Sequence, residues 1–122
     1  MYSILTLNKI AAVGTDKFDS SKYTVGEEVS NPDAIMVRSA KMHDMEFGSN
    51  LLAIARAGAG VNNIPVDKCA ESGIVVFNSP GANANAVKEL AICALLLSSR
   101  KITEAAAWAA SLKGLSLIHI SE

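Results

Sequence analysis

Residues 52–77, LAIARAGAGVNNIPVDKCAESGIVVF, carry the clearest fold signal in the chain. Two short apolar runs, 52–55 and 74–77, have the length and character of buried strands. Between them, residues 65–72 fit a short helix, with a proline in the first turn and Gly73 where a left-handed cap ends a helix. This segment therefore predicts a strand, a helix and a second strand.

Three further β-type runs precede this unit, at residues 2–7 and 34–37 and, more weakly, at 23–25. The intervals between them leave room for helices or long turns. Continuous apolar strands that alternate with helical segments are typical of a parallel sheet covered on both faces. The predicted fold class is α/β.

Two helices are expected after this unit. Residues 78–83 are a loop, because a proline and a glycine interrupt both helix and strand, and a long helix then begins at Asn83 or Asn85 and ends near Lys101. Within it, residues 90–97 leave no polar face, so we expect protein around the helix on all sides. A second helical stretch, 101–113, ends at Gly114.

Composition narrows the function classes. A chain of 122 residues is long enough for one domain with a core, and 50 % apolar with 19 % charged residues is typical of a globular protein. The formal net charge is −1, with no basic run, so the electrostatic signature of a nucleic-acid binder is missing. A small-molecule partner fits better.

Cys69 and Cys93 lie far apart without a CxxC pair, which indicates reduced, buried thiols rather than a disulfide or zinc site. His43 has no partner at metal-ligand spacing, so we expect a surface or packing role. We assign no catalytic and no metal-binding residue. The N-terminus lacks a signal-peptide pattern, and the run 90–97 is far shorter than the roughly 20 residues of a membrane span, which predicts a cytoplasmic chain without membrane contact.

In open parallel sheets, ligands bind beyond the carboxyl ends of the strands. Arg38 and Ser39 directly follow the run 34–37. The planar guanidinium of Arg38 can hold a phosphate or a carboxylate, and the alternative is a strand-end arginine paired with a surface carboxylate.

Two more segments occupy strand ends. Residues 56–63 contain Gly58 and Gly60, so the turn either cradles an anion with its N–H groups or is a plain tight turn. Asn63 stands where GxGxxG needs its third glycine, which excludes a dinucleotide loop. Residues 78–85 carry amides ahead of a helix, which favours either an anion site or simple capping. The residues alone predict an α/β domain that binds a small anion.

Three segments together resemble successive motifs of the D-isomer-specific 2-hydroxyacid dehydrogenases: 33–40 (DAIMVRSA), 56–64 (RAGAGVNNI) and 78–90 (NSPGANANAVKEL). The resemblance extends to about residue 113. It implies an incomplete flavodoxin-like substrate-binding domain at 1–100 and a helix at 101–113 that leads to an absent NAD-binding Rossmann domain. Residues 114–122 do not resemble the family's linker, and we interpret them as an out-of-frame or cloning-derived end.

The resemblance also implies a reaction, the transfer of hydride from a 2-hydroxy acid to NAD. The most similar branch oxidises the phosphorylated 2-hydroxy acid 3-phosphoglycerate to 3-phosphohydroxypyruvate for serine biosynthesis, although glyoxylate and hydroxypyruvate reductases share these loops. The family's hydride-transfer residues and its GxGxxG belong to the later domain, so we expect this chain alone to be inactive. In the full-length form the resemblance implies a homodimer.

By the same resemblance, substrate-binding positions are Arg38, Ser39, Ala59 and Gly60, and cofactor-binding positions are Ala59, Asn83, Ala86 and Val87. The chain departs from the family pattern at several places. Asn62 stands where Asp is usual, so any electrostatic role of that Asp is lost while its role in a turn remains.

Two other functions stay open. The chain could be a free-standing module that binds a small anion without catalysis. It could also be an interaction piece whose helix at 90–97 joins a dimer partner.

Overall fold

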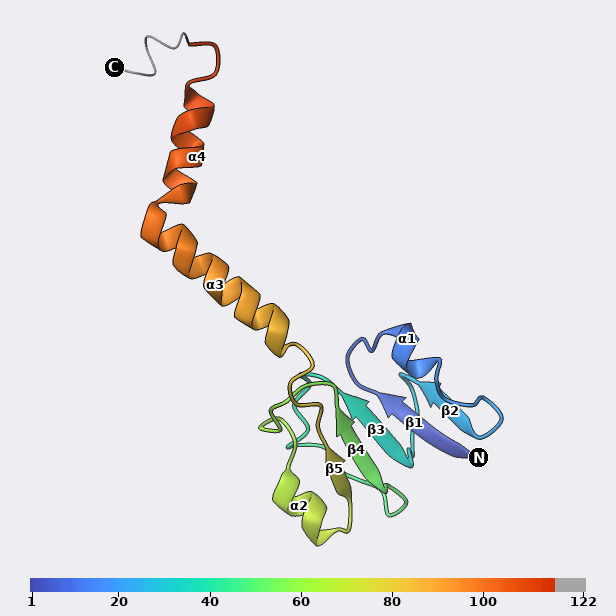
Figure 1. Ribbon diagram of the computed structural model, residues 1–122. Coiled ribbons are helices and arrows are strands. Elements are labelled where there is room, and N and C mark those ends of the chain that lie inside the picture. Colours follow the sequence, from blue (N-terminus) through green and yellow to red (C-terminus); the bar gives the residue numbers. More distant parts are fainter. Residues whose placement is uncertain (116–122) are drawn as a thin grey trace. The chain divides into compact units, whose positions relative to one another are not determined.

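The computed structural model describes residues 1–115, which belong to two compact units, 1–82 and 83 onward, each described by itself. The first unit holds a parallel sheet of β1 (Tyr2–Thr6), β2 (Tyr23–Gly26), β3 (Ala34–Val37), β4 (Ala53–Arg56) and β5 (Val75–Phe77). The strand order is β2-β1-β3-β4-β5 (Figure 1). This is the flavodoxin-like order, so the predicted fold class is confirmed.

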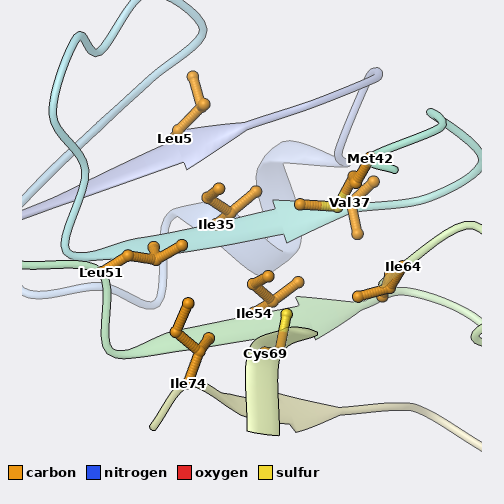
Figure 2. Packing of buried hydrophobic residues seen from close by; sticks show 9 residues of the cluster. All are labelled: Leu5, Ile35, Val37, Met42, Leu51, Ile54, Ile64, Cys69 and Ile74. Atoms are coloured by element: carbon orange, nitrogen blue, oxygen red, sulfur yellow. The ribbon is translucent and has the colours of Figure 1, made fainter. Parts of the chain in front are cut away.

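The core lies on one face of the sheet. Ile35, Val37 and Ile54 alternate with less buried neighbours along β3 and β4, and they pack against Cys69 of α2 (Val66–Glu71). Figure 2 shows these side chains together with Met42, which closes the carboxyl end of the cluster. Because alternate residues of a strand point to opposite faces, one set of apolar positions builds this core.

The other face of the sheet is only partly covered within residues 1–82. Val75 and Phe77 of β5 point there and are 52 % and 56 % exposed. The expectation of a sheet covered on both faces is therefore wrong for this unit. The reason lies in the connections, because those between β1 and β4 hold just one short helix, α1 (Ala12–Thr15), and are otherwise irregular.

The second unit consists of α3 (Ala84–Arg100) and α4 (Ile102–Ser111) in its described part. Asn83, one of the two residues at which the helix was predicted to begin, is the N-cap residue of α3. Its side chain makes no capping hydrogen bond. Lys101, at φ 50°, adopts the left-handed conformation that separates the two helices. The tail beyond residue 115 lies outside the described residues.

The apolar stretch of α3 is exposed in this chain. Leu90 is 71 % and Leu95 68 % exposed, and Cys93 is exposed as well, so the expectations of a surrounded helix and of a buried Cys93 are wrong here. Within residues 83–115 just one other helix, α4, is available to pack on α3, and a single neighbour cannot cover all sides of a helix.

Among the helices of residues 1–115, none combines the length and the apolar character that a membrane span requires.

Candidate functional site

The direction of the strand order reverses between β1 and β3, and the loops there meet through Asn8. Its backbone adopts φ 69°, a conformation that asparagine tolerates, and its side-chain Oδ1 accepts hydrogen bonds from three successive N–H groups. These belong to Arg38, Ser39 and Ala40, at 3.1, 3.0 and 2.9 Å. Since this row of donors is already satisfied, a ligand at this end of β3 has to use the side chains of Arg38 and Ser39.

Arg38 lines an open cleft of about 490 Å³ on the less covered face of the sheet, beside Met36 and Ala57. One guanidinium nitrogen donates to the backbone oxygen of Lys9 at 3.3 Å. The partner of Arg38 is thus a neutral carbonyl rather than the surface carboxylate of the alternative interpretation. Because that carbonyl is neutral, the contact does not neutralise the positive charge of Arg38.

The glycine turn after β4 folds around Arg56. The Nη1 of Arg56 donates to the carbonyl of Gly60, and a Cβ atom on Gly58 or Gly60 would lie 3.2 Å from the guanidine group. A contact of 3.2 Å is tighter than nine in ten real Cβ contacts, so a side chain at either glycine would displace the guanidine group by a few tenths of an ångström. Within residues 1–115, the six N–H groups from Gly58 to Asn63 donate to no carbonyl or side chain, and those of Ala59 and Gly60 are two of the donors thus left for an anion.

The loop after β5 is fastened to this turn. Asn78 Nδ2 donates to the Ala59 carbonyl at 2.9 Å, and the Ser79 N–H donates to the Gly58 carbonyl at 3.0 Å. The Ser79 hydroxyl adds a bond of 3.2 Å to the Arg56 carbonyl. The second and third predicted segments therefore form one hydrogen-bonded unit at the carboxyl edge of the sheet.

Asn63 joins the first segment to the second. Its side chain is buried, at 7 % exposed, and Nδ2 donates to the backbone carbonyls of Arg38 and Ala40 at 3.0 and 2.8 Å. The backbone carbonyl of Asn63 accepts a hydrogen bond from the Met42 N–H at 2.8 Å. The residue that breaks the GxGxxG pattern thus has a structural function. The next helix begins only at Val66, so the turn is not a phosphate-binding loop that runs directly into a helix.

A second cleft, of about 400 Å³, lies at the carboxyl ends of β3 and β4 and is lined by Ser39, Lys41, His43, Arg56, Asn62 and Asn63. Arg38 and Ser39 are neighbours in sequence, yet they line different clefts. His43 is exposed, and its Nε2 lies 2.7 Å from the Asn62 carbonyl. The ends of β3 and β4 therefore line two separate clefts rather than one shared cleft.

Sequence reasoning did not single out Asn8, Lys41 or Arg56. Asn8 follows the first strand at the point where the strand order reverses, so its position next to β1 is a usable signal once the order is known. Lys41 and Arg56 each follow a predicted strand within a few residues. Their convergence depends on the register of β3 and β4, which pairs Val37 with Arg56.

The predicted cofactor positions Asn83, Ala86 and Val87 lie at the start of α3 in the second unit. The Val87 N–H donates to the Asn83 carbonyl at 3.0 Å, and all three residues are exposed. Cys69 of α2, by contrast, is buried in the core, and this burial raises the pKa of its thiol, while the charge of Lys68 has a smaller opposite effect. Cys69 is therefore a packing residue rather than a nucleophile.

Known proteins match this chain along most of its length. A hydroxypyruvate reductase of Thermotoga maritima is 47 % identical over 76 residues, covering 60 % of the chain and 25 % of the relative. A D-3-phosphoglycerate dehydrogenase of Archaeoglobus fulgidus is 40 % identical over 92 residues, covering 73 % of the chain and 18 % of the relative.

Among solved structures, the NAD⁺-bound 3-phosphoglycerate dehydrogenase of Entamoeba histolytica superposes with a TM-score of 0.62 at 25 % identity, over 79 % of this chain and 38 % of that one. The chain thus spans a quarter or less of the two curated relatives named above. The sequence profile described as the D-isomer specific 2-hydroxyacid dehydrogenase, catalytic domain, matches residues 4–119. Because this match extends over nearly the whole chain and agrees with the observed sheet, the chain belongs to the D-isomer-specific 2-hydroxyacid dehydrogenase family.

Proposed function

We propose that this chain is the substrate-binding part of an NAD-dependent dehydrogenase that oxidises 3-phosphoglycerate to 3-phosphohydroxypyruvate in serine biosynthesis. Several relatives carry the name D-3-phosphoglycerate dehydrogenase, and the similar solved structure is one such enzyme with NAD⁺ bound. The observation that carries the proposal is the joined set of strand-end loops. It leaves the N–H groups from Gly58 to Asn63, and so those of Ala59 and Gly60, unpaired within residues 1–115.

In this proposal each group has a role that follows from its chemistry. The substrate carboxylate accepts hydrogen bonds from the Ala59 and Gly60 N–H groups, which the Arg56-filled turn holds in place. Arg38 supplies a cation with a planar set of donors, and Ser39 supplies a hydroxyl that can donate or accept. The bound acid is thereby oriented by fixed dipoles before reaction.

Two of the predicted cofactor positions have groups that can pair with a carboxamide. Within residues 1–115, the Ala59 N–H donates to no protein oxygen and the Asn83 side chain makes no capping hydrogen bond. On the resemblance to the family, Ala59, Asn83, Ala86 and Val87 are the positions that would hold the nicotinamide end of NAD. When bound, NAD supplies the acceptor for the hydride that leaves C2 of the hydroxy acid.

The larger architecture is part of the same proposal. Residues 1–100 form the substrate domain, residues 101–113 lead to an NAD-binding domain in the whole enzyme, and the whole enzyme is a homodimer. The exposed leucines of α3 support the last point, because apolar surface of this kind marks an interface. They equally support a second candidate function, in which the chain acts as a dimerisation piece.

A titration of the 122-residue chain with 3-phosphoglycerate, followed by backbone amide NMR, tests the proposed substrate site. We expect the largest shifts at Ala59 and Gly60, and roughly tenfold or greater weakening in Arg38→Ala, as for the loss of a charged hydrogen-bond donor. Lys22→Ala, which removes a charge from an exposed turn near the opposite edge of the sheet, is the matched control. Saturating ligand without any shift at these two amides would contradict the proposal.

A further inference from the structure

A third cleft, of about 240 Å³, lies at the amino ends of the strands, away from the loops that form the proposed substrate site. It is on the less covered face of the sheet, because Ala34 and Ala53, which line it, alternate along β3 and β4 with the core residues Ile35 and Ile54. The first residues of β1, β2, β3 and β4 line this amino-end cleft, together with Ile4, Asp33 and Leu52.

The wall and floor of the amino-end cleft are aromatic and apolar. Tyr2 and Tyr23 are paired in the register of β1 and β2, and their ring centroids lie 6.1 Å apart with the planes inclined by 31°. Tyr2 is 55 % exposed, so much of its ring is available to a ligand. Ile4 and the small side chains of Ala34 and Ala53 add apolar surface. A tyrosine ring attracts a cation that lies over its face, because the π-electrons make that face negative.

Asp33 is the one charged residue among the described residues that line the amino-end cleft. Its carboxylate accepts hydrogen bonds from the N–H and the hydroxyl of Ser3 and from the Asn50 amide, which are all neutral donors. These bonds use three of the roughly four acceptor positions of a carboxylate and leave one for a ligand. The Ser3 N–H lowers the pKa of Asp33 most and the N-terminal ammonium least, so the negative charge is kept without a close cation.

This combination of surfaces selects one class of ligand. An anion is repelled by Asp33, and a neutral apolar molecule would cover the carboxylate without giving it a donor, which is costly. A cation with an apolar body avoids both penalties, since its head pairs with Asp33 while its body covers the apolar wall. The volume of about 240 Å³ lies below the roughly 300 Å³ at which sites for drug-sized ligands begin, so the ligand is small.

From these observations we infer that the amino-end cleft binds a small organic cation, an alkylammonium whose head group contacts Asp33 and the tyrosine rings. This inference does not rest on the proposed function. The proposed substrate is an anion, and the charge of Asp33 repels it from this end of the sheet.

Three probes with the same butyl chain isolate the charge of the head group. In amide NMR titrations of the 122-residue chain at neutral pH, we expect n-butylammonium to give saturable shifts at Tyr2, Tyr23, Ala34 and Ala53. Binding of 1-butanol should be about tenfold weaker or more, as for the loss of one charged hydrogen bond, and pentanoate should give no shift.

Two variants test the residues named in the inference. Asp33→Asn should weaken n-butylammonium binding about tenfold, whereas Asp44→Asn, which removes the same charge from an exposed turn, should leave the dissociation constant within a factor of about two. Because Asp33 also holds Ser3 and Asn50, Tyr2→Leu provides a test that leaves those contacts intact. It keeps an apolar side chain, removes the ring and should weaken binding about two- to fivefold.

Four results would overturn the inference. They are no saturable shift with n-butylammonium, equal affinity for n-butylammonium and 1-butanol, binding of pentanoate at the same amides, and equal weakening by Asp33→Asn and Asp44→Asn. Titration with 3-phosphoglycerate keeps the two proposals apart. Shifts confined to Ala59 and Gly60 in that titration support the proposed function, and their absence leaves the result with n-butylammonium unaffected.

Discussion

At the scale of single residues, two asparagine side chains connect the loops at the carboxyl ends of the strands. Asn8 accepts from three N–H groups after β3, and Asn63 donates to two carbonyls of the same loop. Between them they satisfy backbone groups that no strand or helix can pair. The site therefore depends on side-chain amides that replace regular secondary structure.

Replacement of Asn63 by alanine should destabilise the first unit by about 2 kcal/mol, because two carbonyls lose their donors in a buried place. Urea unfolding of the chain, followed by far-UV circular dichroism, measures the change in the free energy of unfolding. The control is Asn62→Ala at the exposed neighbour, where a surface substitution changes stability by about 0.5 kcal/mol or less. Equal losses in the two variants would show that the Asn63 contacts are dispensable.

We predict that the hydrogen bonds of the Asp33 carboxylate, just before β3, are sensitive to acid. The Ser3 N–H, at 2.7 Å from Oδ2, and then the Asn50 amide lower the pKa of this carboxyl below its ordinary value of 3.8. As the pH falls, the carboxyl of Asp33 is therefore protonated at a higher pH in the unfolded chain than in the folded chain. The contribution of Asp33 to stability is complete above the ordinary pKa and is lost as the pH falls through the lower folded value.

Carboxyl-carbon NMR of Asp33 measures this pKa directly. We expect Asn50→Ala to move the pKa of Asp33 back toward 3.8, because one hydrogen bond to the charged form is removed. We expect Asp33→Asn to remove part of the loss of stability seen below pH 4 in acid unfolding. An unchanged acid profile in Asp33→Asn would mean that Asp33 makes no net contribution there.

At the scale of elements, the turn that ends α2 shows how backbone conformation limits sequence. Gly73 follows the C-cap Ser72 at φ 75°, in the left-handed region, and Ile74 alone separates it from β5. Nothing would contact a Cβ atom at this position, so sterics with neighbours are not the constraint. The backbone angle alone requires glycine.

Gly73→Ala should therefore destabilise the first unit by about 1 kcal/mol, the cost of placing a side chain in the left-handed region. Gly14 in α1 provides a matched control, because a Cβ atom there also meets open space while the backbone is helical. Gly14→Ala should be neutral or slightly stabilising, since alanine loses less chain entropy in a helix. Chemical unfolding of both variants gives the comparison, and a neutral Gly73→Ala would contradict the argument.

At the scale of the whole molecule, the exposed apolar surface of α3 is the dominant feature of the second unit. Leu90, Ile92, Leu95 and Leu96 are each at least 50 % exposed. Because burial of such surface is favourable, the isolated chain should self-associate as its concentration rises. Sedimentation velocity over a concentration series measures this directly.

The double variant Leu90→Gln with Leu95→Gln should shift the chain toward monomer. Val13→Gln is the control, since it removes an apolar side chain of similar exposure, 76 %, from α1 in the first unit. A chain that stays monomeric at every concentration would contradict both the dimerisation candidate and the homodimer of the proposed enzyme. A change in Val13→Gln alone would instead place the contact on the first unit.

Much of the fold was predictable because it depends on local pattern. The four apolar runs, the helix before Gly73 and the division of α3 from α4 near Lys101 follow from strand length, capping and helix-breaking residues. The weaker run at 23–25 became an edge strand, β2, and α1 was missed because its four residues carry no capping signal. The exposure of Cys93 was mispredicted, since apolar composition indicates a partner but does not provide one in the same chain.

What the sequence determined by itself is the α/β class, the strand positions and the three polar segments at strand ends, because each depends on residues close together in the chain. Only the tertiary structure decided which of those segments meet. The pairing of β1 with β3 brings Asn8 to the loop after Val37, and the pairing of β3 with β4 brings Arg56 into the cleft with Lys41. The physical reason is that strand order and register are set by burial of the sheet as a whole, so neighbours at the sheet edge are not encoded by any local pattern.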